Sequence, residues 1–213
     1  MTIKNERGKI MKERYYENLL NINTSGEQRW DKKNIHYHPY EPTLYSALEV
    51  LFEDYYIDKD DCIVDFGCGK GRLNFYLNYF FKCFVTGIEM NQIFYIEAME
   101  NKNTYLKKNK KSIDKINFEC CLAQDYKIQN YDNKFYFFNP FSVQIFTKIV
   151  ENILISFEKS PRTIDIILYY PSEDYIYYLE YASPFILYKD IIIPKLNNKD
   201  ERERFVIYRL EYR

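Results

Sequence analysis

The chain has 213 residues, which is long enough for one domain with its own hydrophobic core. A composition of 46% hydrophobic and 29% charged residues excludes intrinsic disorder, and a formal net charge of −1 disfavours a protein that mainly binds phosphate backbones. The sequence has no apolar run that could span a membrane and begins with a charged segment that lacks a signal core, so we expect a cytoplasmic protein.

The first 40 residues are polar, with helical character over Lys9–Leu20. A second helix is predicted from Glu41 to Tyr55, because Pro42 suits a first turn and apolar residues then recur at helical spacing. From Cys62 onward, short apolar runs alternate with longer segments of helical period, which is typical of βαβ units and a mostly parallel sheet.

This alternation predicts five strands, four helices between and after them, and a C-terminal antiparallel hairpin. The predicted strands are Cys62–Asp65, Cys83–Glu89, Ile116–Leu122, Phe135–Phe138 and Thr163–Tyr170, and the hairpin strands are Phe185–Ile193 and Phe205–Tyr212. The predicted helices are Arg72–Phe81, Asn91–Asn109, Val143–Lys159 and Glu173–Tyr181. The sequence therefore predicts an α/β fold.

A glycine-rich loop follows the first predicted strand. Residues 63–72 read IVDFGCGKGR, so a buried strand ends in an acid and three alternating glycines lead into a helix. Glycine lets the backbone approach a ligand closely, and the helix start offers unpaired amides. At the carboxyl end of a parallel strand, this pattern favours a nucleoside-type ligand.

The spacing of the glycines excludes two common phosphate-binding loops. A P-loop needs Ser or Thr after a Gly-Lys pair, and the residue after Lys70 is Gly71. A dinucleotide fingerprint needs a third glycine where Arg72 stands, which disfavours an NAD-dependent oxidoreductase.

The loop D-x-G-x-G-x-G resembles motif I of class I S-adenosylmethionine (SAM) dependent methyltransferases, and small bacterial members of that family show a similar arrangement of motifs from about residue 36 onward. The resemblance implies a Rossmann-like methyltransferase fold, with a seven-stranded, mostly parallel sheet of order 3-2-1-4-5-7-6 that ends in an antiparallel hairpin. It also implies SAM as cofactor and S-adenosylhomocysteine (SAH) as product. We expect residues 1–58 to form a helical segment that covers the cofactor site, and residues 59–213 to form the SAM-binding domain, in one globular unit.

The same resemblance implies a set of cofactor contacts. Glu89, at the end of the second strand and 20 residues after Gly69, stands where an acid accepts hydrogen bonds from ribose hydroxyls. After the third strand, Asp125 is the candidate for the adenine amino group and Gln124 is the alternative. The full expected set of cofactor-binding residues is Asp65, Phe66, Gly67, Cys68, Gly69, Gly71, Glu89, Met90, Gln124, Asp125 and Asn139.

The fourth strand leads into Asn139-Pro140-Phe141, which is similar to the Asn-Pro-Pro-Tyr/Phe motif of enzymes that methylate planar amino nitrogens. The second proline is absent here, so the resemblance implies contact with the acceptor and leaves its chemistry open. With Tyr40, these three residues are the expected substrate contacts.

Methyl transfer from a sulfonium needs mainly proximity and alignment, although some acceptors must lose a proton. Asn139, His36 and Glu41 are the candidates for a catalytic role, with His38 close by in the sequence. The five cysteines match neither a disulfide framework nor a zinc site, so we expect reduced thiols and no metal.

The acceptor stays open among a small molecule, RNA and a protein side chain, and the sequence does not indicate the oligomeric state. Five lysines between Lys107 and Lys115 form a basic run that is typical of a solvated helix end and also suits an RNA-facing patch. The alternative function is therefore an RNA-binding protein that keeps the methyltransferase fold without turnover.

Overall fold

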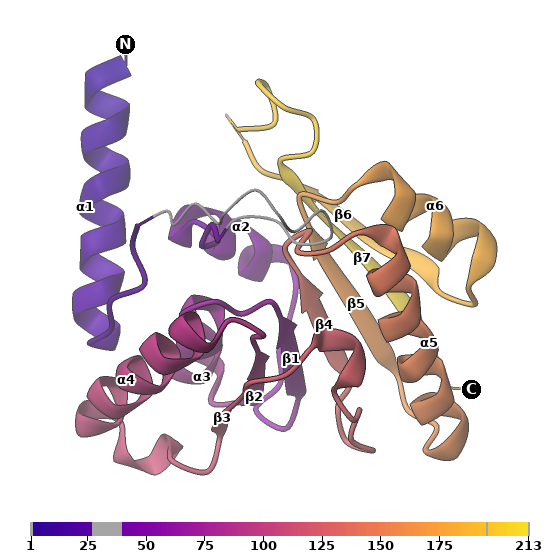
Figure 1. The fold of residues 1–213 in the computed structure, drawn as a ribbon. Coiled ribbons are helices and arrows are strands. Elements are labelled where there is room, and N and C mark those ends of the chain that lie inside the picture. The colour runs from indigo at the N-terminus through magenta and orange to yellow at the C-terminus, as the bar shows by residue number, and fades with distance from the viewer. Residues whose placement is uncertain (1, 27–39, 195, 213) are drawn as a thin grey trace.

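The computed structural model describes residues 2–26, 40–194 and 196–212. In them, seven strands form one sheet in the order β3-β2-β1-β4-β5-β7-β6 (Figure 1). All neighbouring strands are parallel except for the antiparallel pairs β5–β7 and β7–β6, which confirms the expected fold class and strand order. The strands are β1 (Cys62–Phe66), β2 (Phe84–Ile88), β3 (Ile116–Glu119), β4 (Lys134–Phe137), β5 (Ile164–Tyr169), β6 (Ile186–Ile192) and β7 (Arg204–Leu210).

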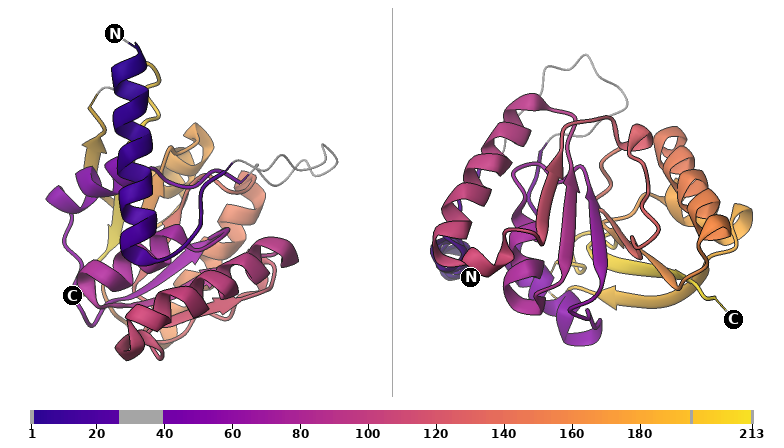
Figure 2. Two further views of the ribbon diagram at one scale, coloured as in Figure 1. Left: turned by 90° about the vertical axis from the view of Figure 1, so that its left-hand side faces the viewer. Right: turned by 90° about the horizontal axis from the view of Figure 1, so that it is seen from below.

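Helices cover both faces of this sheet, so the molecule has three layers (Figures 1 and 2). The helices α2, α3 and α4 lie on one face and α5 and α6 on the other, while α1 stands beside α2 and α3 as an outer helix. The α-helices are α1 (Thr2–Leu20), α2 (Tyr45–Asp54), α3 (Arg72–Phe81), α4 (Gln92–Lys108), α5 (Val143–Lys159) and α6 (Glu173–Ala182). Two short 3₁₀ turns, η1 (Lys110–Ser112) and η2 (Ala123–Asp125), flank β3.

Each face of the sheet has its own hydrophobic core, because successive strand residues point to opposite faces. In β1, Ile63 packs with the helices α2, α3 and α4, whereas Val64 and Phe66 pack with α5 and α6. The central strands β4 and β5 are buried along their whole length, as expected for parallel strands covered on both sides. The sheet is therefore a rigid platform whose strand ends position the loops.

The predicted start of the second helix is wrong. Residues 41–44 are not helical, and α2 begins at Tyr45 rather than at Glu41. Two tertiary contacts hold this segment out of the helix: the Thr43 hydroxyl lies 2.8 Å from the hydroxyl of Tyr136, and the Thr43 carbonyl accepts a hydrogen bond from Arg72. The helical periodicity of the sequence does not contain these long-range partners.

The C-terminal hairpin lies where the sequence predicts it, and β7 pairs with β5 to place the hairpin at one edge of the sheet. Within the described ranges, no helix is both long and apolar enough to cross a membrane.

Candidate active site

The glycine loop after β1 adopts a conformation that requires glycine. Gly67, Gly69 and Gly71 all have positive φ, of 77°, 54° and 85°. Most side chains disfavour this left-handed region, and three such residues in five positions make a tight turn into α3. The backbone amides of Gly67 and Cys68 both donate to the carbonyl of Ile88 at the end of β2, which anchors the loop to the neighbouring strand.

Two residues from outside the loop pack directly against it. A Cβ atom at Gly69 would lie 2.1 Å from Cε2 of Tyr40, and one at Gly67 would lie 2.9 Å from Cβ of Pro140. The loop thus brings together the segment before α2 and the segment after β4, which are remote in the sequence.

A cleft opens between these segments, at the carboxyl ends of β1, β2 and β4. This is the edge of an open parallel sheet where ligands bind. The residues that line the cleft are Tyr40, Glu41, Pro42, Thr43, Asp65, Gly67, Cys68, Arg72, Leu73, Ile88, Glu89, Met90, Phe94, Cys121, Ala123, Tyr136, Phe138, Pro140 and Phe141.

The carboxylate of Glu89 is buried in this cleft. Its Oε2 accepts a hydrogen bond from the amide of Gly69 at 2.9 Å, and its Oε1 accepts one from the amide of Asn91 at 2.7 Å. Burial raises the pKa of Glu89, although these amides act in the opposite direction. A carboxylate has about four acceptor positions, so Glu89 retains acceptor capacity for hydroxyl groups of a ligand.

Asp65 of β1 is the second buried acid of the cleft. Burial and, to a lesser degree, the charge of Glu89 raise the pKa of Asp65 to about 8. The side-chain amide of Asn74 donates to Oδ2 of Asp65 at 3.0 Å. At neutral pH, Asp65 is therefore mainly protonated and can donate a hydrogen bond.

The opposite wall of the cleft is formed by β4 and the turn after it. Tyr136 reaches the cleft from β4, and the ring centroid of Phe138 lies 4.4 Å from that of Tyr169. Asn139 has a φ of 39°, and the carbonyl of Phe141 accepts a hydrogen bond from the hydroxyl of Tyr175 at 2.7 Å. This wall is aromatic and is held from both the sheet and α6.

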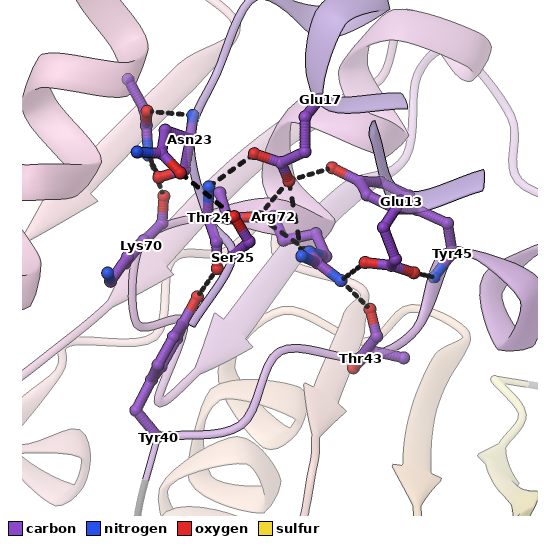
Figure 3. Close-up of polar contacts among 11 residues, drawn as sticks. Glu13, Glu17, Asn23, Thr24, Ser25, Tyr40, Thr43, Tyr45, Lys70 and Arg72 are labelled. Carbon is purple, nitrogen blue, oxygen red and sulfur yellow. Dashed lines mark hydrogen bonds and ion pairs between the residues drawn. The ribbon is translucent and has the colours of Figure 1, made fainter. Parts of the chain in front are cut away.

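Arg72, the first residue of α3, connects the glycine loop to the N-terminal segment (Figure 3). Its guanidinium forms ion pairs with Glu13 at 2.5 Å and Glu17 at 3.4 Å, both on α1. It also donates to the hydroxyl of Thr24 at 2.8 Å and to the carbonyl of Thr43 at 3.1 Å. The Arg72 side chain therefore connects α1, the loop that follows α1 and the segment before α2.

Tyr40 joins the same group of contacts, with its hydroxyl directed at Thr24 (Figure 3). Its hydroxyl donates to the carbonyl of Thr24 at 2.8 Å, and its ring centroid lies 4.9 Å from that of Phe94 on α4. The ring occupies the space directly over Gly69, so a ligand that approaches the loop here contacts or displaces the ring.

The structure places nine of the residues expected at the site in the cleft lining, and six others outside it. The nine are Tyr40, Glu41, Asp65, Gly67, Cys68, Glu89, Met90, Pro140 and Phe141. Those outside the lining are Phe66, Gly69, Gly71, Gln124, Asp125 and Asn139, all within a few residues of lining positions. His36 and His38 lie outside the described residues.

Phe66 and Gly71, which do not line the cleft, pack against other side chains of the protein. The Phe66 side chain is buried in the core between the sheet and α5, with its ring centroid 5.0 Å from that of Phe137. A Cβ atom at Gly71 would lie 2.6 Å from Cζ of Phe118, so this glycine is needed for packing.

Several lining residues were missed by the sequence analysis, among them Thr43, Arg72 and Tyr136. Tyr136 follows from the alternation of β4, since its neighbours Phe135 and Phe137 face α5. Arg72 has the clearest signal, because an arginine that begins a buried helix needs acidic partners. Those partners, Glu13 and Glu17, lie four residues apart on one face of the predicted N-terminal helix.

No group of three or more His, Cys, Asp or Glu side chains in the described part of the chain is arranged to hold a metal ion. No family model matches the sequence, and no curated protein matches it either.

Solved structures, in contrast, share the fold over most of the chain. A candidate RNA methyltransferase from Pyrococcus horikoshii aligns with 93% of this chain and 97% of its own, at 18% identity and a TM-score of 0.55. An RNA methyltransferase from Salinibacter ruber in complex with SAH aligns with 79% of this chain and 92% of its own, at 16% identity and a TM-score of 0.52. A SAM-dependent methyltransferase from Aquifex aeolicus aligns with 76% and 88%, at 14% identity and a TM-score of 0.53. The chain has the Rossmann-like fold of these methyltransferases.

Proposed function

We propose that this chain is a SAM-dependent methyltransferase. The observation that carries the proposal is the cleft itself: a left-handed glycine loop and a buried carboxylate, Glu89, meet at the carboxyl ends of β1 and β2. The shared fold with SAM-dependent and SAH-bound methyltransferases supports it. Residues 1–58 then provide the cover of the site, since Tyr40, Glu41 and Thr43 belong to its lining.

The residues present suit an adenosine-containing cofactor. Glu89 has acceptor capacity left for ribose hydroxyls, and Met90 follows it in the lining. Oε1 of Gln124 is buried and accepts no hydrogen bond from the described residues, and Gln124 follows Ala123 of the cleft lining, so it is one candidate acceptor for the adenine amino group. Asp125, exposed at the end of η2, is the second candidate for that group.

SAM supplies a methyl group that its sulfonium already activates, so the protein must mainly align the acceptor and exclude water. In this proposal, Asn139, Pro140 and Phe141 form one side of the acceptor position, and Tyr40 forms the other. Glu41, an exposed residue of the cleft lining, is the candidate carboxylate for an acceptor proton, with His36 as the other candidate base, and Asn139 would accept a hydrogen bond from the acceptor.

Isothermal titration with SAH tests the proposal. We expect wild-type protein to bind SAH in the micromolar range, and Glu89→Ala to weaken binding by about 1.5–3 kcal/mol, the usual contribution of a hydrogen bond to a charged group. Glu89→Gln keeps an acceptor and should lose less. The matched control is Glu100→Ala, an exposed glutamate of α4 that does not line the cleft.

A folded wild-type protein that does not bind SAH would contradict the proposal, and equal affinities for Glu89→Ala and wild type would remove Glu89 from the ribose role. The alternative, an RNA-binding protein without turnover, predicts RNA binding but no transfer of labelled methyl from SAM to RNA, protein or small molecules. A cytoplasmic location remains our expectation from the sequence.

A further inference from the structure

A second hollow lies far from the cleft and is lined almost entirely by lysines. Its lining consists of two polar residues, Asn109 and Ser112, and six lysines. The lysines are Lys82, Lys107, Lys108, Lys110, Lys111 and Lys115. They come from the turn after α3, the last turn of α4, η1 and the residue before β3.

The positive charge of this hollow is not balanced locally. Among the described residues, no acidic side chain lines it, and none of its six ammonium groups forms an ion pair with a carboxylate. Residues 107–115 contain five lysines and one aspartate, which gives a local charge of +4 in a chain of net charge −1. Such a concentration of cations at one place attracts a polyanion.

Aromatic rings lie beside these lysines. Nζ of Lys115 lies 4.5 Å from the ring centroid of Phe84, a ring that is 38% exposed. Nζ of Lys82 lies 4.9 Å from the ring centroid of Tyr79. A surface that binds single strands combines ammonium groups for the phosphates with nearby rings on which bases can stack.

These features favour RNA over an anionic membrane. A membrane is flat and is usually contacted by protruding apolar side chains, whereas the lysines here line a concavity. Ile113 is the one strongly exposed apolar side chain within residues 107–115.

The hollow and the cleft lie at opposite ends of the same helix. The helix α4 starts just after Glu89 and ends at Lys108, and its 17 residues span about 25 Å (Figure 1). We propose that the lysine hollow binds single-stranded RNA whose acceptor nucleotide reaches the cleft. RNA binding by the hollow does not depend on the proposed methyltransferase function, whereas the placement of an acceptor nucleotide in the cleft rests on that function.

The test measures the binding of a fluorescein-labelled, 20-nucleotide single-stranded RNA by anisotropy at several salt concentrations. The test variant changes Lys107, Lys108, Lys110 and Lys111 to Glu, and a second variant changes them to Gln. The control changes Lys59, Lys127, Lys148 and Lys159 to Glu; these are exposed lysines elsewhere, so the net charge changes equally. Circular dichroism and SAH titration check the fold and the cleft of every variant.

We expect the Glu variant to lose at least tenfold in affinity and the control less than threefold. The slope of log K against log salt should become shallower by about 2–3 in both the Glu and Gln variants, as four lost phosphate contacts predict for single strands. Phe84→Ala should weaken the binding of single-stranded RNA by at least fivefold and should affect the binding of duplex RNA less.

Equal losses in the test and control variants would overturn the proposal, and so would wild-type protein that binds anionic phosphatidylserine vesicles but not RNA. SAH binding without RNA binding would refute this inference and leave the proposed function intact. RNA binding without SAH binding would refute the proposed function and leave the hollow as a nucleic-acid surface.

Discussion

At the scale of single residues, the cleft holds two buried carboxyl groups in different surroundings. Glu89 receives hydrogen bonds from two backbone amides, whereas Asp65 receives one from the side chain of Asn74. Burial and the nearby charge of Glu89 raise the pKa of Asp65 to about 8. Of the two, Glu89 has the better hydrogen-bond support for a negative charge, and Asp65 has the pKa that burial raises to about 8.

The raised pKa of Asp65 predicts a specific dependence of stability on pH. A group whose pKa is higher in the folded state stabilises the fold fully below its unfolded value of about 4, and this contribution is lost as the pH rises toward 8. Asp65→Asn removes the ionisation. We expect urea denaturation to show that the stability of Asp65→Asn relative to wild type improves by at least about 1.4 kcal/mol between pH 5 and pH 8. A difference that does not change with pH would contradict the assignment.

The sequence predicts that Glu89 belongs to the site because its position depends on local order: it is an acid at a strand end, at a set distance from the loop, and it lines the cleft. It did not identify Thr43 or Tyr136, whose hydroxyls meet across the cleft from positions 93 residues apart. Nothing in the spacing of either segment encodes that meeting. It depends on how the chain before α2 crosses the sheet.

At the scale of elements, the join between β5 and β7 is centred on a buried acid. Asp165 of β5 has no exposed surface and accepts hydrogen bonds from Arg209 of β7 at 2.7 and 2.9 Å, and from Lys134 of β4 at 3.1 Å. The hydroxyl of Tyr55 also donates to it. Burial acts to raise the pKa of Asp165, but the bonds from Arg209 and the charge of Lys134 lower it overall.

Asp165→Asn should therefore destabilise the protein by about 3 kcal/mol, because it leaves Arg209 without its buried partner and Lys134 with only its longer ion pair to Asp61. The control is Asp190→Asn, which breaks the half-exposed ion pair between Asp190 and Arg204 in the same hairpin. Exposed pairs contribute about 0–1 kcal/mol, so the control should change little. Urea denaturation gives the free energy of unfolding of both variants. Similar losses in the two variants would contradict the prediction that the buried Asp165 contributes more than the half-exposed Asp190.

The elements themselves follow from the sequence more closely than their ends. The ranges of α3 and α5 agree with the predictions, because periodic apolar residues begin and end with the helix. The predicted third strand continues to Leu122, whereas β3 ends at Glu119, level with Ile88 at the end of its partner β2. A strand ends where its neighbour ends, and hydropathy does not report that limit.

At the scale of the whole molecule, ligand binding and global stability are linked. A ligand that binds only the folded state at 100 times its Kd stabilises it by about 2.7 kcal/mol. For a chain of this length, SAH at that concentration should raise the melting temperature by about 5–10 °C in differential scanning fluorimetry. NADH should give no shift, and a shift with NADH but not with SAH would revive a dinucleotide-binding function.

The global arrangement also shows what the sequence left open. The order of the sheet was predicted as a whole from its resemblance to a known fold, and the two cores follow from alternation along the strands. The lysine hollow was predicted only in part, as a basic run over 107–115. Its sixth lysine, Lys82, comes from a different turn that the pairing of β2 and β3 brings alongside.

Arg72 has a consequence for the energetics of the outer helix. Its side chain holds Glu13 and Glu17 of α1, which lie outside the cleft lining, while its backbone begins the helix that follows the glycine loop. Detachment of α1 and distortion of the glycine loop would therefore disturb the same ion pairs. If a bound ligand protects α1 from amide hydrogen exchange, a docked α1 must in turn strengthen the binding of that ligand. Thermodynamic reciprocity makes these two free-energy changes equal. A helix outside the cleft lining would then contribute to the affinity of a ligand in the cleft.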